Sequence, residues 1–510
     1  MEEVAEIVKK QSSLAISTPP VQVQVNHQIH SPNSISFPKS PYNSRFMNTP
    51  LATPLKKVIE NILEEVGHFT KFDQQDDWLP ITACRKGNAY YAAFHLLCSG
   101  IGFQALVLPL AFTTLGWTWG ILCLCVAFTW QLYTLWLLIQ LHESDTGIRH
   151  SRYLKLAMAA FGEKLGKILV LFPVQYLSGG TCVTLIMIGG GTMKILFQMV
   201  CEDSSCSLYQ LKTIEWYLVF TVAAILLAQL PNLNSIAGVS LIGAITAVGY
   251  CSLIWIVSVY QGRLDNVSYE PPRRQSQATR IFSVWNALGI IAFAFRGHNL
   301  VLEIQGTIRS DSKNPSRLAM WKGVMFAYLV IASCLFPLAI GGYWAYGNLM
   351  PSNGGMLSAL KKYHEHDTSK FIIALTSLLV VINGLSSFQI YAMPIFDNLE
   401  FRYTSKWNKP CPRWLRIVFR SLFGCLTFFI SIALPFLPSL AGLIGGVALP
   451  ITLAYPCFMW ILIKKPKKHS TTWYLNWTLG AVGMILSVLI VIGAIWGIVA
   501  LGIQIHFFNP

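Results

Sequence analysis

Charged and polar side chains interrupt an apolar stretch at residues 291–308, "IAFAFRGHNLVLEIQGTI". Arg296 and His298 follow directly on apolar residues, and Glu303 comes seven residues after Arg296. An ionised side chain in the middle of a bilayer costs at least ~2.5–3.5 kcal/mol, so each of these residues needs a partner, water or a function. On a continuous helix a seven-residue separation corresponds to ~10 Å, which is too far for direct contact between Arg296 and Glu303.

This cluster allows more than one kind of chemistry. Arg296 or Glu303 serves a substrate carboxylate or a coupling ion; alternatively, both belong to ion pairs that lock the inner half of a helix bundle. His298 either titrates near neutral pH or hydrogen-bonds a neighbouring backbone carbonyl. The residues alone leave these alternatives open.

Further polar side chains lie inside the apolar stretch 383–400, "NGLSSFQIYAMPIFDNLE". Ser386 and Ser387 form part of a polar stripe in this stretch, and Asp397 lies near the end of the stretch. Tyr176, beside "SGGT", either turns its hydroxyl toward a cavity or bonds it to a neighbouring carbonyl. The candidates for proton coupling or gating are His298, Glu303, Ser386, Ser387 and Asp397.

The chain is too apolar for a soluble protein. Of its 510 residues, 54% are hydrophobic and 12% are charged, whereas soluble domains carry roughly 25% charged residues. Apolar runs long enough to cross a hydrocarbon core of ~30 Å recur from about residue 89 onward. We predict an all-α polytopic protein of the lipid bilayer. Its net charge of +15 lies in the tail and short loops, as membrane orientation requires, so nucleic acid is not a predicted partner.

Eleven membrane spans are predicted, and the first and sixth are interrupted by polar residues or glycines. Gly100 and Gly102 lie near the centre of span 1, as packing notches or as a backbone break. Two broken helices five spans apart indicate an inverted-repeat transporter, with spans 1–5 and 6–10 as halves and span 11 as an addition. The predicted spans lie near 89–112, 117–141, 168–199, 214–231, 234–260, 281–305, 321–346, 370–399, 415–435, 437–462 and 474–504.

The part of the chain before the first span divides in two. Residues 1–54 are rich in Ser, Thr, Pro, Gln and Asn, which is typical of a disordered tail; its Ser-Pro and Thr-Pro pairs are possible sites for kinases or other regulators. Residues 55–88 begin with apolar side chains at helical spacing, which predicts an amphipathic helix and a pre-membrane segment. Residues 89–510 form the predicted transmembrane domain.

The charges of the loops predict the orientation. Lys and Arg are more frequent in the loops that share a side with the N-terminal tail, which places the N-terminus in the cytosol and the C-terminus outside. Cys201 and Cys206 then lie in an outer loop, where a local disulfide is plausible. The sequon at Asn266 also falls outside and is a predicted glycosylation site.

The sequence carries no enzyme signature. The "GGGT" at residues 189–192 lies within a span and lacks the lysine of a phosphate-binding loop. The polar run "KKYHEHD" at 361–367 is more readily an exposed loop than a metal site. We expect neither an enzyme nor a bound metal or cofactor.

Several long strings resemble one known family. The resemblance is to the plant amino acid/auxin permeases, and within them to the lysine/histidine transporter-like members, and it covers most of the chain from Trp78 onward. The strings are "WLPIT" at 78–82, "FAFRGHNLVLEIQ" at 293–305, "GGYWAYGN" at 341–348, "SSFQIYAMP" at 386–394 and "YPCFMWILIKKP" at 455–466.

The resemblance implies a five-plus-five inverted repeat and proton-coupled amino acid uptake, usually at the plasma membrane. It also implies that the amino and carboxyl groups of the substrate meet the broken backbones of spans 1 and 6. With Tyr176 added from the residue pattern, the predicted substrate site consists of Gly100, Ile101, Gly102, Gln104, Tyr176, Phe293, Phe295 and Arg296.

Two residues depart from the family pattern. Gln104 stands where better-known relatives have a third glycine, and Arg296 stands where they have a small residue. The added cation favours acidic substrates or binds a second carboxylate. Span 5 lacks the lysine that serves some proton-coupled permeases, so Glu303 and Asp397 are the candidate proton carriers.

The predicted function is import of amino acids with protons, which are the coupling ion, by alternating access. An alternative from the same class is an importer of another organic anion, such as an auxin-like indole acid. An amino acid receptor that does not transport is the alternative from a different class.

Overall fold

The computed structural model describes residues 78–82, 85–144, 147–201, 211–270, 276–311, 314–351, 354–434 and 437–500. The predicted disordered tail and amphipathic helix lie outside the described residues, and so does Cys206. The described residues belong to one compact unit, Leu63–Pro510.

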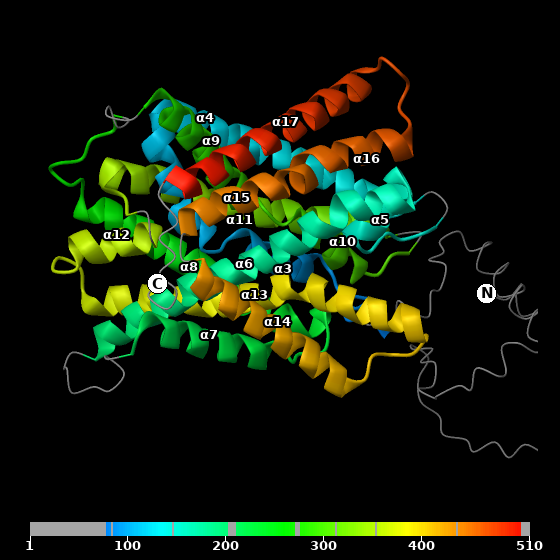
Figure 1. The fold of residues 1–510 in the computed structure, drawn as a ribbon, viewed down its shortest axis with the longest axis horizontal. Helices are drawn as coiled ribbons and strands as arrows, with labels where there is room; N and C mark the ends of the chain where they lie inside the picture. Colours follow the sequence, from blue (N-terminus) through cyan, green and yellow to red (C-terminus); the bar gives the residue numbers. More distant parts are fainter. Residues whose placement is uncertain are drawn as a thin grey trace, which may run out of the picture. The chain divides into compact units, whose positions relative to one another are not determined.

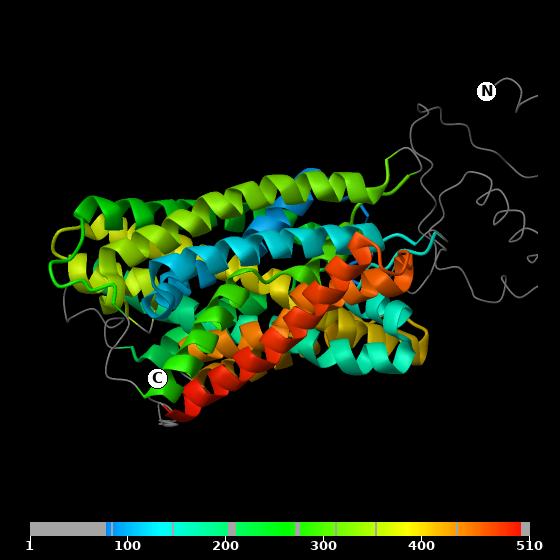
Figure 2. The ribbon, with the colours of Figure 1, turned by 90° about the horizontal axis from the view of Figure 1, so that it is seen from above.

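The described part of the chain is helical, and its only β pairing consists of two isolated bridges. Figure 1 shows the helices side by side along one long direction, and Figure 2 shows the same bundle from above, with α17 inclined to its neighbours. The helices are α3 (Ala89–Gly100), α4 (Gln104–Leu141), α5 (Tyr153–Phe161), α6 (Glu163–Val200), α7 (Thr213–Leu227), α8 (Ala237–Gln261), α9 (Gln277–Ala294), α10 (His298–Gly306), α11 (Ser316–Tyr346), α12 (Gly355–His364), α13 (Lys370–Trp407), α14 (Arg413–Ala433), α15 (Leu437–Leu449), α16 (Tyr455–Lys464) and α17 (Thr471–Ala500).

Nine helical segments of the described chain are long and apolar enough to cross a membrane, against eleven predicted. The difference arises at two places. The predicted spans 1 and 2 share the 38-residue α4, which consists of two helical segments joined at Gly116, where φ is 71°. The predicted span 4 is α7, an apolar helix of 15 residues that is shorter than most single crossings.

The helical backbone is interrupted where the sequence places its two breaks. Residues 101–103 separate α3 from α4, and residues 295–297 separate α9 from α10. Gly297 has a φ of 129°, a conformation that side chains other than glycine rarely adopt. A third irregularity, the π-helical segment Pro450–Ala454 between α15 and α16, was not predicted.

The two breaks lie at the centre of the packed helices. The long helix α13 packs against α6 and α8, α3 packs against α8 and α11, and α9 packs against α4, α15 and α17. At Gly243 of α8, a Cβ atom would overlap Cys98 of α3 and Ser386 of α13. A glycine is therefore required for these three helices to approach one another, as is common between membrane helices.

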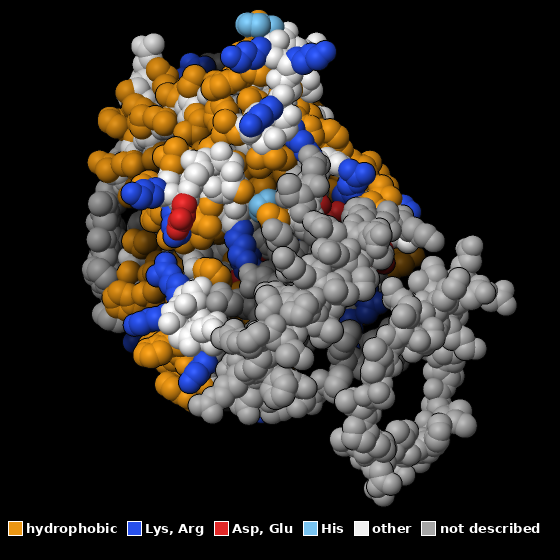
Figure 3. Space-filling view, turned by 90° about the vertical axis from the view of Figure 1, so that its right-hand side faces the viewer, with side chains coloured by type: hydrophobic (Ala, Val, Ile, Leu, Met, Phe, Trp, Pro, Cys, Tyr) orange, Lys and Arg blue, Asp and Glu red, His pale blue; other side chains and the backbone are white. Residues whose placement is uncertain are grey.

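Basic side chains gather at one end of the bundle. Figure 3 looks onto the end that carries α5, the C-terminal part of α13 and the loop between α16 and α17, where Lys and Arg outnumber Asp and Glu. The basic residues of this end include Lys155, Arg402, Lys406, Lys409, Lys464, Lys465, Lys467 and Lys468.

Candidate functional site

The backbone break between α3 and α4 is held open by side-chain hydrogen bonds. A helix that stops inside a bilayer leaves carbonyl groups without their helical partners, and each needs another donor. Four successive carbonyls at the end of α3 receive one, three of them from α13. The bonds are Ser387 Oγ to Cys98 O (2.8 Å), Tyr391 OH to Ser99 O (2.9 Å), Gln104 Nε2 to Gly100 O (2.7 Å) and Asn383 Nδ2 to Ile101 O (3.3 Å).

The second break carries Arg296, whose side chain is 2% exposed. Its Nε donates to the hydroxyl of Tyr391 at 3.0 Å. The guanidinium carbon lies 4.3 Å from the ring centre of Phe293, 4.9 Å from that of Tyr391 and 5.1 Å from that of Phe103. Neither Nη1 nor Nη2 has a hydrogen-bond partner among the described residues. The rings stabilise the cation, but the N–H groups of Nη1 and Nη2 stay unused.

Arg296 reaches across to the first break. A Cβ atom built on Gly102 would lie 3.5 Å from Nη2 of Arg296 and 2.7 Å from Oε1 of Gln104. That Oε1 atom is buried and also has no hydrogen-bond partner in the described part of the chain. The two breaks, five predicted spans apart, therefore meet at Gly102, where the unused Nη2 of Arg296 and the unused Oε1 of Gln104 both lie.

The helices that begin at the breaks add positive partial charge to the site. The first turn of α4 starts at Phe103 and that of α10 at Gly297, and no side chain caps either N-terminus. Some of the first-turn N–H groups bond carbonyls of the same turn, but each N-terminus still presents the positive end of its helix dipole. Together with Arg296, they form a site suited to a carboxylate, with Gln104 Oε1 available to an ammonium group.

The first turn of α10 is fixed to neighbouring helices. His298 Nε2 lies 2.9 Å from the hydroxyl of Thr134 on α4. Asn299 Nδ2 donates to Ser178 Oγ on α6 at 2.9 Å. His298 is thus bonded to a side-chain hydroxyl, which was not predicted, and it also interacts with the backbone of Gln131.

The far end of α10 is held by Arg149, in the segment between α4 and α5. Its Nη2 donates to the carbonyls of Gln305 (3.1 Å) and Ile308 (2.8 Å), and its Nε forms an ion pair with Glu143 (3.5 Å). Burial lowers the pKa of Arg149 to about 10. The side chain therefore remains a cation near pH 7, as suits the negative end of a helix dipole.

A buried ion pair lies near the C-terminal end of α13. Arg152 donates to both carboxylate oxygens of Asp397, with Nε at 2.5 Å and Nη2 at 3.2 Å, and its Nη2 also donates to Thr82 at 3.2 Å. The backbone N–H of Ile81 donates to Asp397 at 3.4 Å. We call these four residues the Arg152 cluster. Glu303, 5% exposed, interacts electrostatically with Asp397 and Arg152.

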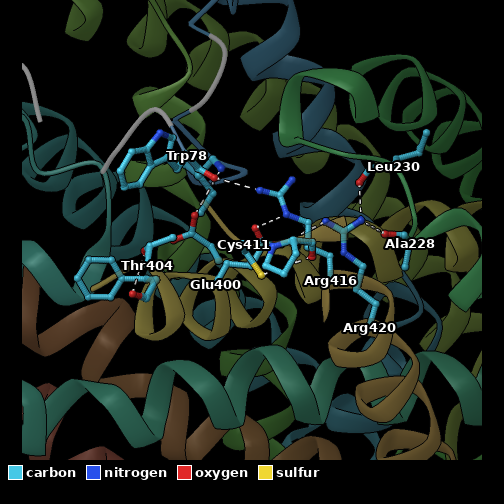
Figure 4. Close-up of polar contacts among 12 residues, drawn as sticks. Trp78, Ala228, Leu230, Glu400, Thr404, Cys411, Arg416 and Arg420 are labelled. Carbon is cyan, nitrogen blue, oxygen red and sulfur yellow. Dashed lines mark hydrogen bonds and ion pairs between the residues drawn. The ribbon is translucent and has the colours of Figure 1, made fainter. Parts of the chain in front are cut away.

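A second ionic group lies one turn further along α13, and Figure 4 shows it. Glu400 pairs with Arg416 at 3.0 Å and with Arg420 at 3.6 Å, both from α14. Arg416 donates to the carbonyl of Trp78 at 3.2 Å. Arg420 also bonds the carbonyls of Ala228 (2.6 Å) and Leu230 (2.8 Å), after α7. Glu400, Arg416, Arg420 and Trp78 form the Glu400 cluster.

Some predicted site residues contact groups other than Arg296. Tyr176 is half-buried and stacks on the exposed Phe172, with ring centres 5.6 Å apart. Ser386 bonds the carbonyl of Ile382 in its own helix. Phe295 packs edge-on against Phe128 at 5.9 Å.

Two sites predicted for the outer loops have partial descriptions. Cys201 is disulfide-bonded. Because Cys206 lies outside the described residues, the pairing of these two cysteines stays a prediction. Asn266 is exposed in a turn after α8, where a glycan would have access.

The comparison with known families identifies the chain. A family model described as "Transmembrane amino acid transporter protein" matches residues 85–500, which include both breaks, the Arg152–Asp397 pair and Glu400 with its two arginines. The chain belongs to this family. It is therefore an integral membrane protein of an amino acid transporter family, and it is not an enzyme.

Individual relatives place it more narrowly. It is 57% identical to Lysine histidine transporter-like 8 of Arabidopsis thaliana over 483 residues, covering 94% of this chain and 92% of the relative. It is 46% identical to Lysine histidine transporter-like 7 of the same plant over 436 residues, covering 85% and 90%. The predicted kinship with the lysine/histidine transporter-like members is confirmed.

Among solved structures, the fold is similar to a substrate-bound, outward-open Na+-coupled sialic acid symporter. The sequence identity is 12% and the TM-score is 0.47, and the match covers 83% of this chain and 92% of that chain. A TM-score this low supports no detailed comparison.

Proposed function

We propose that this protein is a secondary active transporter that imports amino acids together with protons by alternating access. Membership of an amino acid transporter family supports the substrate. The observation that carries the proposal is the pair of unused Arg296 nitrogens at the meeting point of two broken helices. A buried cation without a counterion among the described residues calls for an anionic group from a ligand.

The architecture that fits this function has eleven spans and a five-plus-five inverted repeat. In this arrangement span 1 consists of α3 and the part of α4 before Gly116, and the rest of α4 is span 2. Span 6 consists of α9 and α10. The breaks in spans 1 and 6 then occupy corresponding positions in two halves, as expected for a site between repeats.

Alternating access requires an inner closure that can open. The Arg152 cluster and the Glu400 cluster both connect the segment just before span 1, at Trp78, Ile81 and Thr82, to α13 and α14. We propose that these contacts close the inner side and that they separate when the site opens to the cytosol. Three of the contacts, Ile81–Asp397, Arg152–Asp397 and Trp78–Arg416, join parts of the chain that would lie in different halves of the repeat.

For proton coupling, Glu303 is the better of the two candidate carboxylates. Asp397 is already engaged by two hydrogen bonds from Arg152. Glu303 is buried beside that pair, so protonation of Glu303 would change the charge next to the inner closure. A proton gains ~2.3 kcal/mol per 100 mV of membrane potential and ~1.36 kcal/mol per pH unit, enough for more than tenfold accumulation.

The plasma membrane, with a cytosolic N-terminus and an external C-terminus, suits an importer of this kind. The basic end of the bundle then faces the cytosol, in keeping with the positive-inside rule (Figure 3). Asn266 lies on the outer side, and the phosphorylatable tail meets cytosolic regulators. No cofactor beyond the coupling proton is required.

An electrical recording separates this proposal from its alternatives. A neutral amino acid applied at external pH ~5.5 to cells expressing the protein should evoke inward current, because a zwitterion brings no net charge and the proton that enters with it brings one. An importer of indole acids would respond to those acids and not to amino acids. A receptor would bind amino acid without current, and that result would contradict the proposal. Uninjected cells and a matched surface-expression assay serve as controls.

A further inference from the structure

We infer that the site selects amino acids with two carboxylates and rejects those with a cationic side chain. This inference rests on the proposed function, because it names the substrate class of the same site. It differs from what the names of the relatives suggest, since those names carry lysine and histidine.

The first step is the charge of the site without substrate. The ionisable side chains that act on Arg296 are Tyr391, Tyr250 and Cys182, and none of them is a carboxylate. Of the buried acids, Asp397 and Glu400 are already paired with Arg152, Arg416 and Arg420. The third, Glu303, interacts with Asp397 and Arg152 and is not among the groups that act on Arg296. Arg296 is thus a buried cation without a counterion in the described part of the chain. The site alone carries one positive charge.

The second step is the charge after binding. A dicarboxylic amino acid carries a net charge of −1 and would neutralise the site. A zwitterion such as leucine would leave one buried positive charge, and lysine would place a second cation beside the first. Because an unpaired buried charge and a pair of like charges are both unfavourable, the expected order of affinity is acidic, then neutral, then basic.

The third step is the number of places for a carboxylate. The two Nη groups of Arg296 form a fork that matches both oxygens of one carboxylate. The N-terminus of α4, which adjoins Gly102 and has no side-chain cap, offers the positive end of its helix dipole to another. Nη2 of Arg296 lies close to the space above Gly102, so a short molecule can reach both positions. The unused Oε1 of Gln104 can accept from the ammonium group.

The fork is positioned before any substrate arrives. Tyr391 accepts from Nε, which leaves Nη1 and Nη2 for the ligand. The rings of Phe103, Phe293 and Tyr391 lie within 5.1 Å of the guanidinium carbon. A side chain held in this way loses little freedom on binding, which favours affinity.

The test is competition among three amino acids in cells expressing the full chain. Uptake of labelled glutamate is challenged with unlabelled glutamate, leucine and lysine, at equal surface expression measured by biotinylation. In the wild type, leucine should need at least about ten times the concentration of glutamate for half-inhibition. Lysine should not compete at about a hundredfold excess.

Variants of Arg296 should change this order. Arg296→Gln should weaken glutamate at least about tenfold and let lysine compete with leucine, while Arg296→Lys should keep the acidic preference at lower affinity. Arg280→Gln is the matched control, because Arg280 lies exposed on α9, and it should behave as the wild type. A second measurement needs no variants: the rise in unfolding temperature of the purified wild type on adding each amino acid. This rise should be largest for glutamate, smaller for leucine and smallest for lysine.

The outcomes separate the two proposals. If the wild type takes up none of the three labelled amino acids, the proposed function fails. If it takes up leucine or lysine with an affinity equal to or above that for glutamate, amino acid transport stands and this inference is overturned. An unchanged ranking in Arg296→Gln would overturn it as well.

Discussion

At the scale of single residues, Tyr391 links the two broken helices. Its hydroxyl accepts from Arg296 Nε in the second break and donates to the carbonyl of Ser99 at the first. Its ring also lies 4.9 Å from the guanidinium carbon. One hydroxyl group therefore satisfies a carbonyl that the break releases and sets the direction of the arginine fork.

Replacing Tyr391 with phenylalanine should lower both stability and affinity. The change leaves the carbonyl of Ser99 and the Nε of Arg296 without this partner, and an unsatisfied buried polar group costs about 1–3 kcal/mol. We expect a lower unfolding temperature of the purified protein and a substrate KM about tenfold or more above that of the wild type. Tyr260→Phe removes the same atom from an exposed tyrosine at the end of α8 and should change the KM by less than about twofold. Equal effects of the two variants would contradict this role.

Part of this site could be predicted from the residues. Arg296, Gln104 and Gly102 stand out because charges, amides and glycines are conspicuous in apolar runs. Tyr391 and Phe103 could not be singled out, since an aromatic residue in a membrane span is usually packing. The signal for Tyr391 lay in its spacing: it follows Ser387 by four residues, on the same helix face.

At the scale of elements, α13 supplies polar contacts to several other parts of the bundle. Its middle bonds the carbonyls of the first break, and its C-terminal part carries Asp397 and Glu400. These acids bind the loop before α5, the start of α14 and the segment that precedes span 1. A change in any of these contacts would affect both the site and the Arg152 and Glu400 clusters, which are the proposed inner closure.

The coupling between Arg152 and Asp397 can be measured with a double-mutant cycle. Removing one partner leaves the other charge buried, which costs about 3–5 kcal/mol. Arg152→Ala and Asp397→Ala should each lower the unfolding temperature strongly, and the double variant should lose less than the sum of both. Arg152→Ala should also make cysteines introduced on the inner side of the site more reactive. Arg402→Ala, at an exposed arginine on α13, should change neither measurement. Additive losses would contradict a direct pair.

The elements themselves were largely predictable, because apolar runs of membrane length mark them. The gap between the predicted spans 89–112 and 117–141 includes Gly116, where the two helical segments of α4 meet. The shortness of α7 and the π-helical segment 450–454 were not predicted. Both depend on how neighbouring helices pack, and hydropathy does not report that. The partners of Arg152 were missed because a loop arginine was expected to serve orientation alone. Arg416 lies inside the predicted span 415–435, and no partner was predicted for it.

At the scale of the whole molecule, apolar sides and a basic end define how the bundle sits in a bilayer. Exposed leucines, isoleucines and phenylalanines lie along the membrane helices, and Lys and Arg collect at the end seen in Figure 3. With that end in the cytosol, the Arg152 and Glu400 clusters lie between the site and the cytosol. A proton that enters from outside would then reach Glu303 before it passes them.

The most direct test of proton-coupled uptake uses the purified protein in liposomes. Labelled amino acid should accumulate above equilibrium when the interior is made alkaline by about two pH units, and a protonophore should abolish the accumulation. Glu303→Gln should still equilibrate substrate but should not concentrate it, because the substituted side chain carries no proton. Equal uptake with and without the pH gradient in the wild type would contradict the account.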